Sequence, residues 1–348
     1  MGSTQQPVSV SLRHVPLSTL EDAFGPSSLG IIIVKDLHSS FRTLRRRLLT
    51  LASHLAQLPE EQLDLLVNPQ AHYNVGWSHG VEALRPGVYD TSKGSFYATV
   101  LSSEFASRPD QPELEYPNIW PSEDLLPDFR ETFEELCAMI IDIGILVARA
   151  CDVFAAHNVP DYLAWSLERI VKESTMSRAR LLHYFPQMDD SGPEDAEGDD
   201  SWCAAHVDDG GLTGLTSALF LDESAPLPSY SNKADESLQL SSSTLISDAK
   251  PDPQAGLYIR SRAGEVIKVS IPSDCLAFQT GSALELMTKG KLKAVEHFVR
   301  APSGGEGGKR VARNTLAVFM QPSGEEVVDF ETGKTFGEHI RDADERHA

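Results

Sequence analysis

The chain has 348 residues and carries 51 acidic against 30 basic side chains, a formal net charge of −21 at pH 7. Neutralising phosphates needs clustered Lys and Arg, so this charge argues against a nucleic-acid partner and against docking on anionic lipid. The apolar fraction of 41% supports a sizeable core, and no apolar run is long enough for a membrane span. The N-terminus lacks a basic segment followed by an apolar run, so we expect a cytoplasmic protein without a secretory signal.

The first half of the chain is predicted to be mainly helical. The run LGIIIV at 29–34 is short, apolar and β-branched, which is typical of a buried strand. Leucines recur in steps of three and four over 41–58, which indicates a helix with one buried face. Residues 68–100 are rich in Gly, Pro, Asn and Ser and predict loops with short strands. A long helix is expected over 122–157, apolar nearly all round in its centre, and a second over 162–171.

After residue 178 the pattern changes to about seven short β-like runs separated by loops, which is typical of a sandwich or barrel. We therefore expect a single domain, 1–348, made of a helical N-terminal region (1–175), a β-rich core (176–325) and a C-terminal tail (326–348). Two polar stretches, 187–201 and 222–254, are expected to be insertions on this scaffold or a lid over the site.

The four cysteines, at positions 137, 151, 203 and 275, are sparse and show no C-x-x-C spacing. This usage predicts reduced thiols, because a disulfide framework needs a denser and more regular set. Cys137 and Cys151 fall within the expected long helix, where a free cysteine commonly serves as a small buried hydrophobic residue.

One motif carries metal-binding chemistry. His206 and Asp208 are two residues apart, and on an extended strand residues i and i+2 project to the same face. A second histidine, His297, lies within another β-like run near the far end of the β-rich half. Two histidines and one carboxylate form the facial triad of non-haem Fe(II) oxygenases, and they also occur at catalytic zinc sites. The residues alone leave both metals open.

A second i, i+2 pair follows His297. Arg313 and Thr315 begin the run NTLAVFMQP and share one face of the expected strand. A guanidinium binds a carboxylate through two parallel hydrogen bonds, and a neighbouring hydroxyl adds a third. A dicarboxylate could therefore chelate a metal at one end and bind Arg313 at the other.

Five segments, in this order, resemble the isopenicillin N synthase-like branch of the Fe(II)/2-oxoglutarate-dependent dioxygenases: RLLHYFP (180–186), HVDDGGLTGLT (206–216), GLYIRSRAGEVIKVSI (256–271), DCLAFQTGSALELMTKGKLKAVEHFVRA (274–301) and RNTLAVFMQP (313–322). The resemblance covers 180–322 well and the N-terminal region more loosely. It implies an α+β fold with a mainly β core, a double-stranded β-helix or jelly roll, preceded by helices that include one long backbone helix.

The resemblance also implies roles for individual residues. The His-Asp-His set would be the catalytic iron ligands, and Arg313 with Thr315 would bind the distal carboxylate of 2-oxoglutarate. Thr315 stands where the family has Ser and keeps the hydroxyl. Tyr184 would also contact this cosubstrate, or would be a half-buried strand aromatic.

The implied reaction uses Fe(II), 2-oxoglutarate and O2 to hydroxylate, desaturate or cyclise a small organic substrate, with release of succinate and carbon dioxide. Two alternatives stay open: an iron oxidase that needs no 2-oxoglutarate, and a catalytically silent jelly-roll protein that binds a ligand. Succinate formation would distinguish the implied reaction from the first alternative. Oxygen uptake coupled to substrate oxidation would distinguish it from the second. The sequence leaves the oligomeric state open.

Substrate contacts are expected from the segment 72–98, which corresponds loosely to a region covering the mouth of the barrel. Its candidates are Tyr73, Trp77, Arg85 and Phe96, each with loop packing as the alternative. Three further apolar residues could line the cavity or pack in the core: Leu212, Phe220 and Phe319.

Overall fold

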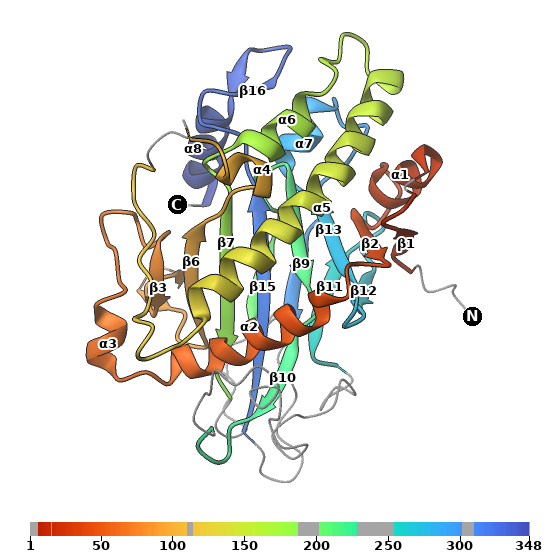
Figure 1. Ribbon diagram of the computed structural model, residues 1–348. Coiled ribbons are helices and arrows are strands. Elements are labelled where there is room, and N and C mark those ends of the chain that lie inside the picture. Colours follow the sequence, from red (N-terminus) through yellow and green to blue (C-terminus); the bar gives the residue numbers. More distant parts are fainter. Residues whose placement is uncertain are drawn as a thin grey trace.

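The computed structural model describes residues 6–14, 16–85, 87–109, 114–186, 202–227, 254–300 and 310–347 (Figure 1). Its helices are α1 (Leu17–Phe24), α2 (Ser40–Ala56), α3 (Glu60–Asp64), α4 (Ser103–Ala106), α5 (Phe129–Asn158), α6 (Ser166–Glu173), α7 (Ser282–Met287) and α8 (Phe336–His347). Mixed α and β structure is therefore confirmed, with mostly antiparallel sheets.

The larger sheet contains nine strands within the described residues. Eight of them run in the order β1-β2-β13-β9-β15-β7-β6-β3, and β10 pairs with one end of β15. In this sheet β1 and β2 pair in parallel, whereas the other neighbours are antiparallel. The bounds are β1 (Val8–Ser11), β2 (Ile31–Lys35), β3 (Gly76–His79), β6 (Lys93–Thr99), β7 (Arg178–Tyr184), β9 (Leu212–Thr216), β10 (Leu219–Asp222), β13 (Leu276–Thr280) and β15 (Val311–Met320).

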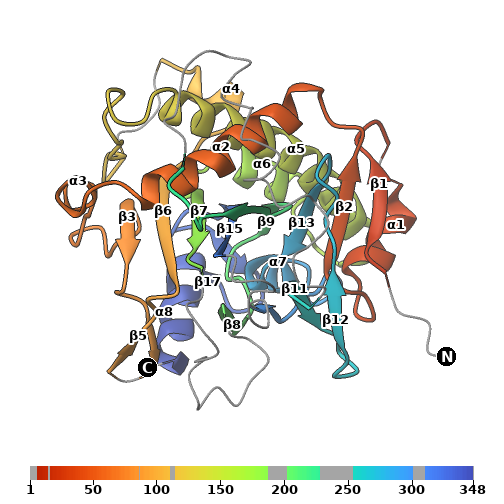
Figure 2. The same cartoon turned by 90° about the horizontal axis from the view of Figure 1, so that it is seen from below.

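A smaller antiparallel sheet faces one side of the larger one, in the order β12-β11-β14-β8. Its strands are β8 (Cys203–His206), β11 (Gly256–Arg260), β12 (Val266–Val269) and β14 (His297–Arg300). Two apolar clusters join the sheets: one packs Ile31 and Ile33 against Ile259, and the other packs Leu182 against Val299. Figure 2 shows the smaller sheet lying across from β9 and β13. Two short hairpins complete the strands: β4 (Ala83–Arg85) with β5 (Val88–Tyr89), and β16 (Val327–Asp329) with β17 (Lys334–Thr335).

Helices cover the other side of the larger sheet, with α2 and α5 crossing it in Figure 1. The longest, α5, buries an apolar stripe against this sheet, as its pattern predicts. It begins at Phe129, later than the expected 122. Pro127 disfavours helical backbone in the residue before it, and Asp128 adopts a left-handed conformation with φ 60°. In the same way α6 begins at Ser166, after the left-handed Trp165.

Strand β15 divides its side chains between the two layers. Its residues 313, 315, 317 and 319 face the smaller sheet and line the cavity between the sheets. Leu316, Val318 and Met320 belong to the core under the helices, where Asn314 donates to the backbone oxygen of Leu49 at 2.7 Å. This alternation follows from the two-residue period of a strand.

Several sequence predictions are confirmed in outline. The strand at 29–34 and the helix at 41–58 correspond to β2 and α2, and the β-like runs after 178 form strands. The run 211–220 forms two strands rather than one, because the chain turns between β9 and β10. The tail 326–348 forms β16, β17 and α8, and its Phe336 packs in the main core. The stretches 187–201 and 228–253 lie outside the described residues.

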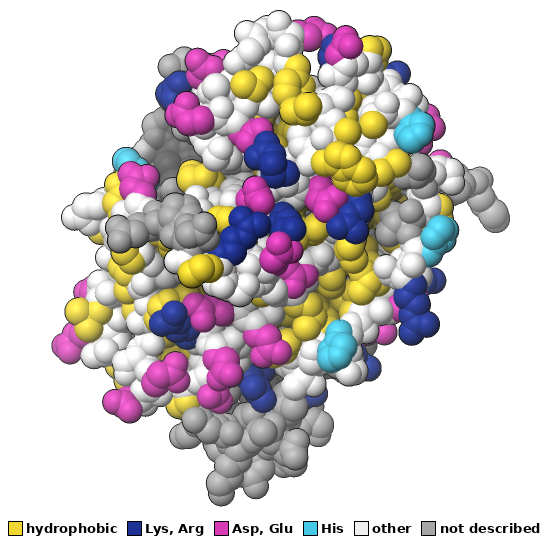
Figure 3. Space-filling view, turned by 45° about the horizontal axis from the view of Figure 1, so that its top comes forward, with side chains coloured by type: hydrophobic (Ala, Val, Ile, Leu, Met, Phe, Trp, Pro, Cys, Tyr) yellow, Lys and Arg dark blue, Asp and Glu magenta, His cyan; other side chains and the backbone are white. Residues whose placement is uncertain are grey.

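All four cysteines are free, as expected. No helix in the described part of the chain is both long and apolar enough to cross a membrane. On the face shown in Figure 3, Lys and Arg side chains lie interspersed with Asp and Glu.

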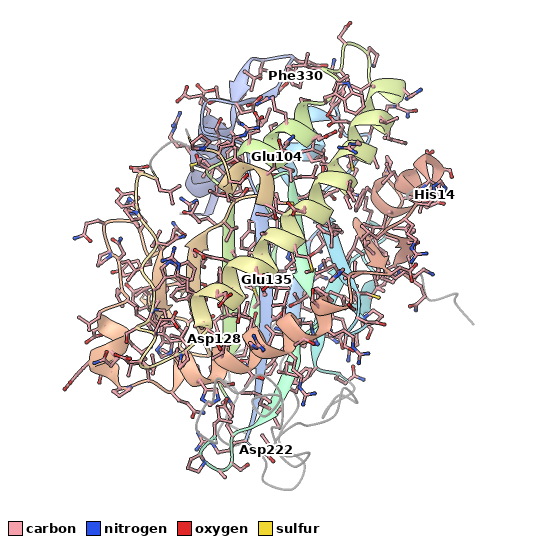
Figure 4. All side chains as sticks on the ribbon, in the orientation of Figure 1. His14, Glu104, Asp128, Glu135, Asp222 and Phe330 are labelled. Atoms are coloured by element: carbon pink, nitrogen blue, oxygen red, sulfur yellow. The ribbon has the colours of Figure 1, made fainter. Side chains whose placement is uncertain are left out.

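An aromatic cluster holds α5 on the sheet. The Phe96 ring of β6 meets Phe129 edge-on at 5.1 Å and Phe133 at 5.7 Å between centroids. Because Phe133 is fully buried, Phe133→Ala should lower the free energy of unfolding by about 3–5 kcal/mol in denaturant titrations. The matched control is Glu135→Ala on the outer face of α5 (Figure 4), expected within about 0.5 kcal/mol of wild type. Equal effects of the two substitutions would contradict this account of the packing.

Candidate metal centre and cavity

The structure brings the three predicted metal-ligating residues together. His206 at the end of β8 is the register partner of His297 at the start of β14. Asp208 follows two residues after β8, and its Oδ1 lies 3.8 Å from the Nε2 atom of each histidine. Each of the three offers a ligand atom within 4.8 Å of the others. This is the two-histidine, one-carboxylate arrangement that leaves coordination positions open on one side.

Each ligand is held by a second contact that leaves its coordinating atom free. Nδ1 of His206 lies 2.8 Å from the backbone oxygen of Ala204, and Nδ1 of His297 lies 3.3 Å from that of Val295. A proton on Nδ1 leaves Nε2 as the lone-pair donor of a neutral ring. The Thr213 hydroxyl donates to Oδ2 of Asp208 at 2.6 Å, so Oδ1 faces the histidines. The donor set therefore fits a divalent metal ion.

The turn that presents Asp208 is fixed by the segment entering α7. The backbone nitrogen of Ser282 donates to the backbone oxygen of Asp208 at 2.7 Å, and that of Gly281 donates to Gly211 at 3.0 Å. A Cβ atom on Gly281 would lie 2.2 Å from the backbone oxygen of Gly210, so only glycine allows this approach. The Ser282 hydroxyl in turn contacts Nε2 of His339 on α8 at 2.7 Å. The C-terminal helix thus supports the turn through Ser282, a link that the sequence did not predict.

Arg313 lies inside the cavity and has unused hydrogen-bonding capacity. Its side chain is only 6% exposed, and its Nε and Nη1 atoms have no hydrogen-bond partner. Its guanidinium stacks on the ring of Tyr184, 4.9 Å from the centroid. The Thr315 hydroxyl, on the same face of β15, donates to the backbone oxygen of Thr216 at 3.3 Å. Because unpartnered donors on a buried cation are costly, this site is suited to an incoming anion.

Burial shifts the pKa of three groups in this cavity. It raises the pKa of Tyr184 to about 12, so the phenol keeps its proton near neutral pH. It lowers the pKa of the Arg313 guanidinium, and the nearby Tyr184 partly offsets this decrease. It also lowers the pKa of His297, against the attraction of Asp208, so this ring is neutral at neutral pH and able to bind a metal. For His206 burial is outweighed by the contacts with Cys203 and Asp208, which raise its pKa to about 9, so this ring releases a proton when it binds a metal.

The two sheets enclose a cavity of about 250 Å³ that contains both groups of residues. Phe220 and Phe319 line it, whereas Leu212 packs in the core. The triad lies at its accessible side: the His206 side chain is 44% exposed, while Asp208 and His297 are buried. One cavity could therefore bind a chelating dicarboxylate at both ends, with one end at the metal triad and the other at Arg313.

The proposed substrate residues are not brought to this cavity. Phe96 and Trp77 lie on the opposite face of the larger sheet, in the core under the helices, because strand alternation turns them away. Tyr73 is half-buried in a turn with φ 60° and is not among the described lining residues. The side chain of Arg85 lies outside the described set. The expectation for Trp77 and Phe96 is therefore wrong.

A charged side chain that the sequence analysis did not select lines the cavity instead. Arg180 lies on β7 on the same face as Leu182 and Tyr184. Its Nε donates to the Ser95 hydroxyl at 3.0 Å, and its Nη2 donates to Glu82. The signal was present, because Arg180 and Tyr184 are four residues apart in one strand and must share a face.

Comparison with known proteins agrees with this geometry. Neither the models of known protein families nor the curated proteins match the sequence. Among solved structures, a putative 2OG-Fe(II) oxygenase family protein from Caulobacter crescentus is 18% identical, with a TM-score of 0.66 over 99% of this chain and 100% of that chain. A full-length Neurospora crassa protein in complex with alpha-KG is 19% identical, with a TM-score of 0.61 over 94% and 89%. The rice dioxygenase for auxin oxidation is 16% identical, with a TM-score of 0.56 over 98% and 96%.

This chain has the fold of the Fe(II)/2-oxoglutarate oxygenases. The predicted resemblance is thus confirmed at the level of fold, and the isopenicillin N synthase-like branch is consistent with these neighbours.

The contact between Thr213 and Asp208 gives a test of the metal centre. Thr213→Val removes the hydroxyl with little change in volume, leaving Oδ2 of Asp208 without this donor. We expect the dissociation constant for Fe(II), measured anaerobically, to rise about 10- to 100-fold. The matched control is Thr99→Val on β6, whose buried hydroxyl has no partner. Unchanged metal affinity in Thr213→Val would contradict a supporting role for this hydrogen bond.

Proposed function

We propose that this protein is a non-haem Fe(II)/2-oxoglutarate-dependent oxygenase that oxidises a small organic substrate. The observation that carries the proposal is the pairing, in one cavity, of an open His-Asp-His set with a buried arginine that has unpartnered nitrogens. A metal site alone would suit zinc hydrolysis equally well. The additional buried cation favours a chelating dicarboxylate cosubstrate.

The iron would be held by Nε2 of His206, Nε2 of His297 and a carboxylate oxygen of Asp208. When bound with 2-oxoglutarate and O2, iron supplies the oxidation of a C–H bond, with 2-oxoglutarate converted to succinate and carbon dioxide. The chain's own contribution is to hold the ligands in place through Thr213 and the two backbone oxygens.

The distal carboxylate of 2-oxoglutarate would bind the Arg313 guanidinium, which keeps donors without a protein partner on Nε and Nη1. Thr315 lies beside it on β15 and Tyr184 lies against its guanidinium. Because its pKa is raised to about 12, Tyr184 remains a phenol that can donate a hydrogen bond to the same carboxylate. This set gives the cosubstrate a fixed orientation relative to the metal.

The two facing sheets support a double-stranded β-helix as the catalytic core, with the helices as its outer cover. Tight packing of α2, α5 and α7 on the larger sheet supports one domain over 1–348. Structural neighbours bind small molecules: thymine and 5-formyluracil are present in complexes of the Neurospora crassa protein. A cavity of about 250 Å³ that also holds 2-oxoglutarate leaves room only for a small substrate.

The direct test is anaerobic reconstitution of the full chain with Fe(II) and 2-oxoglutarate. Wild type should develop a weak visible metal-to-ligand charge-transfer band. His297→Ala should lose the band because a ligand is missing. Arg313→Leu should retain iron but need about 10- to 100-fold more 2-oxoglutarate to develop the band, as expected for loss of a charged hydrogen-bond pair.

The matched controls are His14→Ala and Arg42→Leu, both at exposed positions outside the cavity; Figure 4 labels His14 near α1. Both should give the wild-type band. Iron bound without a band would favour an oxidase that needs no 2-oxoglutarate. Failure to bind iron, with zinc bound instead, would overturn the proposal.

A further inference from the structure

We propose that Arg180 is the substrate-recognition residue of this cavity, and that it hydrogen-bonds a carbonyl oxygen of an uncharged, largely apolar substrate. This inference rests on the proposed oxygenase function, because it takes the metal and Arg313 to be occupied by iron and 2-oxoglutarate.

The position of Arg180 separates it from the cosubstrate anchor. Tyr184 is the register partner of Arg313, whereas Arg180 is the partner of Ala317. Four residues along a strand correspond to about 13 Å, so Arg180 lies well away from the carboxylate end of 2-oxoglutarate. It nevertheless lines the same cavity. It is therefore available to a second molecule.

The guanidinium of Arg180 is fixed in place before any ligand binds. Nε donates to the Ser95 hydroxyl and Nη2 donates to Glu82, while its plane lies over the Tyr97 ring at 5.1 Å. The Tyr97 hydroxyl also donates to Glu82, at 3.2 Å. These two bonds use part of the five N–H donors of an arginine, and the remaining donors can serve a ligand. Such preorganisation lowers the entropic cost of binding.

Charge balance favours an uncharged substrate. Lys93 pairs with Glu82 at 3.1 Å and with Asp90, so two cations and two anions form a neutral cluster around Arg180. At the other end, Arg313 and the metal would be balanced by 2-oxoglutarate and Asp208. A further carboxylate would therefore add an uncompensated negative charge to a buried site, whereas a neutral carbonyl accepts the hydrogen bond without it.

The rest of the cavity indicates the body of the substrate. With both histidines bound to metal, three side chains among the described lining residues are ordinarily charged at neutral pH: Arg180, Asp208 and Arg313. Between them the wall combines apolar side chains such as Leu182, Leu215 and Phe319 with uncharged hydroxyl groups such as that of Ser270. The matching ligand has an apolar body and one carbonyl group, as in an amide, lactam or ketone.

The test uses sets of small probes that differ only in one group. Benzene, cyclohexane and butane bodies each carry a carboxamide, a carboxylate or an ethyl group. Binding to the full chain, loaded anaerobically with Fe(II) and 2-oxoglutarate, is measured by calorimetry, which needs no turnover. In at least one set the carboxamide should bind about tenfold or more tightly than the ethyl probe, the gain expected for one charged hydrogen bond.

Arg180→Leu should remove that preference, and Arg180→Lys should reduce it because the fixed fork is lost. The matched control is Arg178→Leu: Arg178 is two residues earlier on β7, bonds the backbone oxygens of Thr175 and Ser177, and is not among the described lining residues. This control should keep the preference. A carboxamide preference that survives Arg180→Leu, or its absence from every set in wild type, would overturn the inference.

A second variant tests the charge argument without removing the arginine. Glu82 is 36% exposed, and Glu82→Gln leaves an oxygen for Arg180 while giving the cluster a net positive charge. Carboxylate probes should then gain affinity relative to carboxamides by about tenfold. No shift in preference would contradict the balance of charges.

The same samples separate the two proposals. A charge-transfer band in Arg180→Leu with no change in probe preference would overturn this inference alone. Absence of the band in wild type would overturn the proposed oxygenase, and with it the present inference.

Discussion

The antiparallel pairing of β8 with β14 is the constraint on which the candidate site depends. It places His206 directly opposite His297, with ring centroids 4.3 Å apart. Opposed residues in such a pair have neighbouring side chains on one face, so the two rings converge without help from a loop. Asp208 then needs only the short turn after β8 to reach both. The metal-binding atoms therefore come from one end of a small sheet, which is rigid through its hydrogen bonds.

The two arginines that line the cavity come from the facing sheet. Arg313 and Arg180 lie on β15 and β7, and the apolar clusters between the layers fix their distance from the smaller sheet. The helical layer also contributes: Arg45 of α2 donates to the backbone oxygens of Ser217 and Ala218 at 2.9 and 2.8 Å. Both of these residues line the cavity. The outer helices thus shape the site as well as covering the sheet.

Local spacing predicted much of this arrangement. The pair at 313/315 needed only the two-residue period of a strand. Asp208 instead lies in the turn after β8, so its position beside His206 depends on the contacts of that turn. Both pairs line the cavity. Trp77 and Phe96 were misassigned because aromatic character does not reveal which face of a strand is buried under helices. That face is set by the pairing of Phe96 with Leu181 on β7, a contact between distant segments.

The approach of Gly281 to Gly210 is likewise a long-range contact with no local pattern. Packing of the C-terminal tail could not be foreseen either, because its own sequence is strongly polar.

Strand β15 serves the cavity with one set of alternate residues and the core with the other. Deleting or inserting a single residue within it would therefore exchange the two sets, placing Asn314 in the cavity and Arg313 under the helices. A change of two residues would restore the faces but move the guanidinium along the strand by about 7 Å. A side-chain substitution in β15 affects one layer at a time, whereas a change in its length affects the cavity and the core together. We expect its residue count to be less open to evolutionary change than its composition.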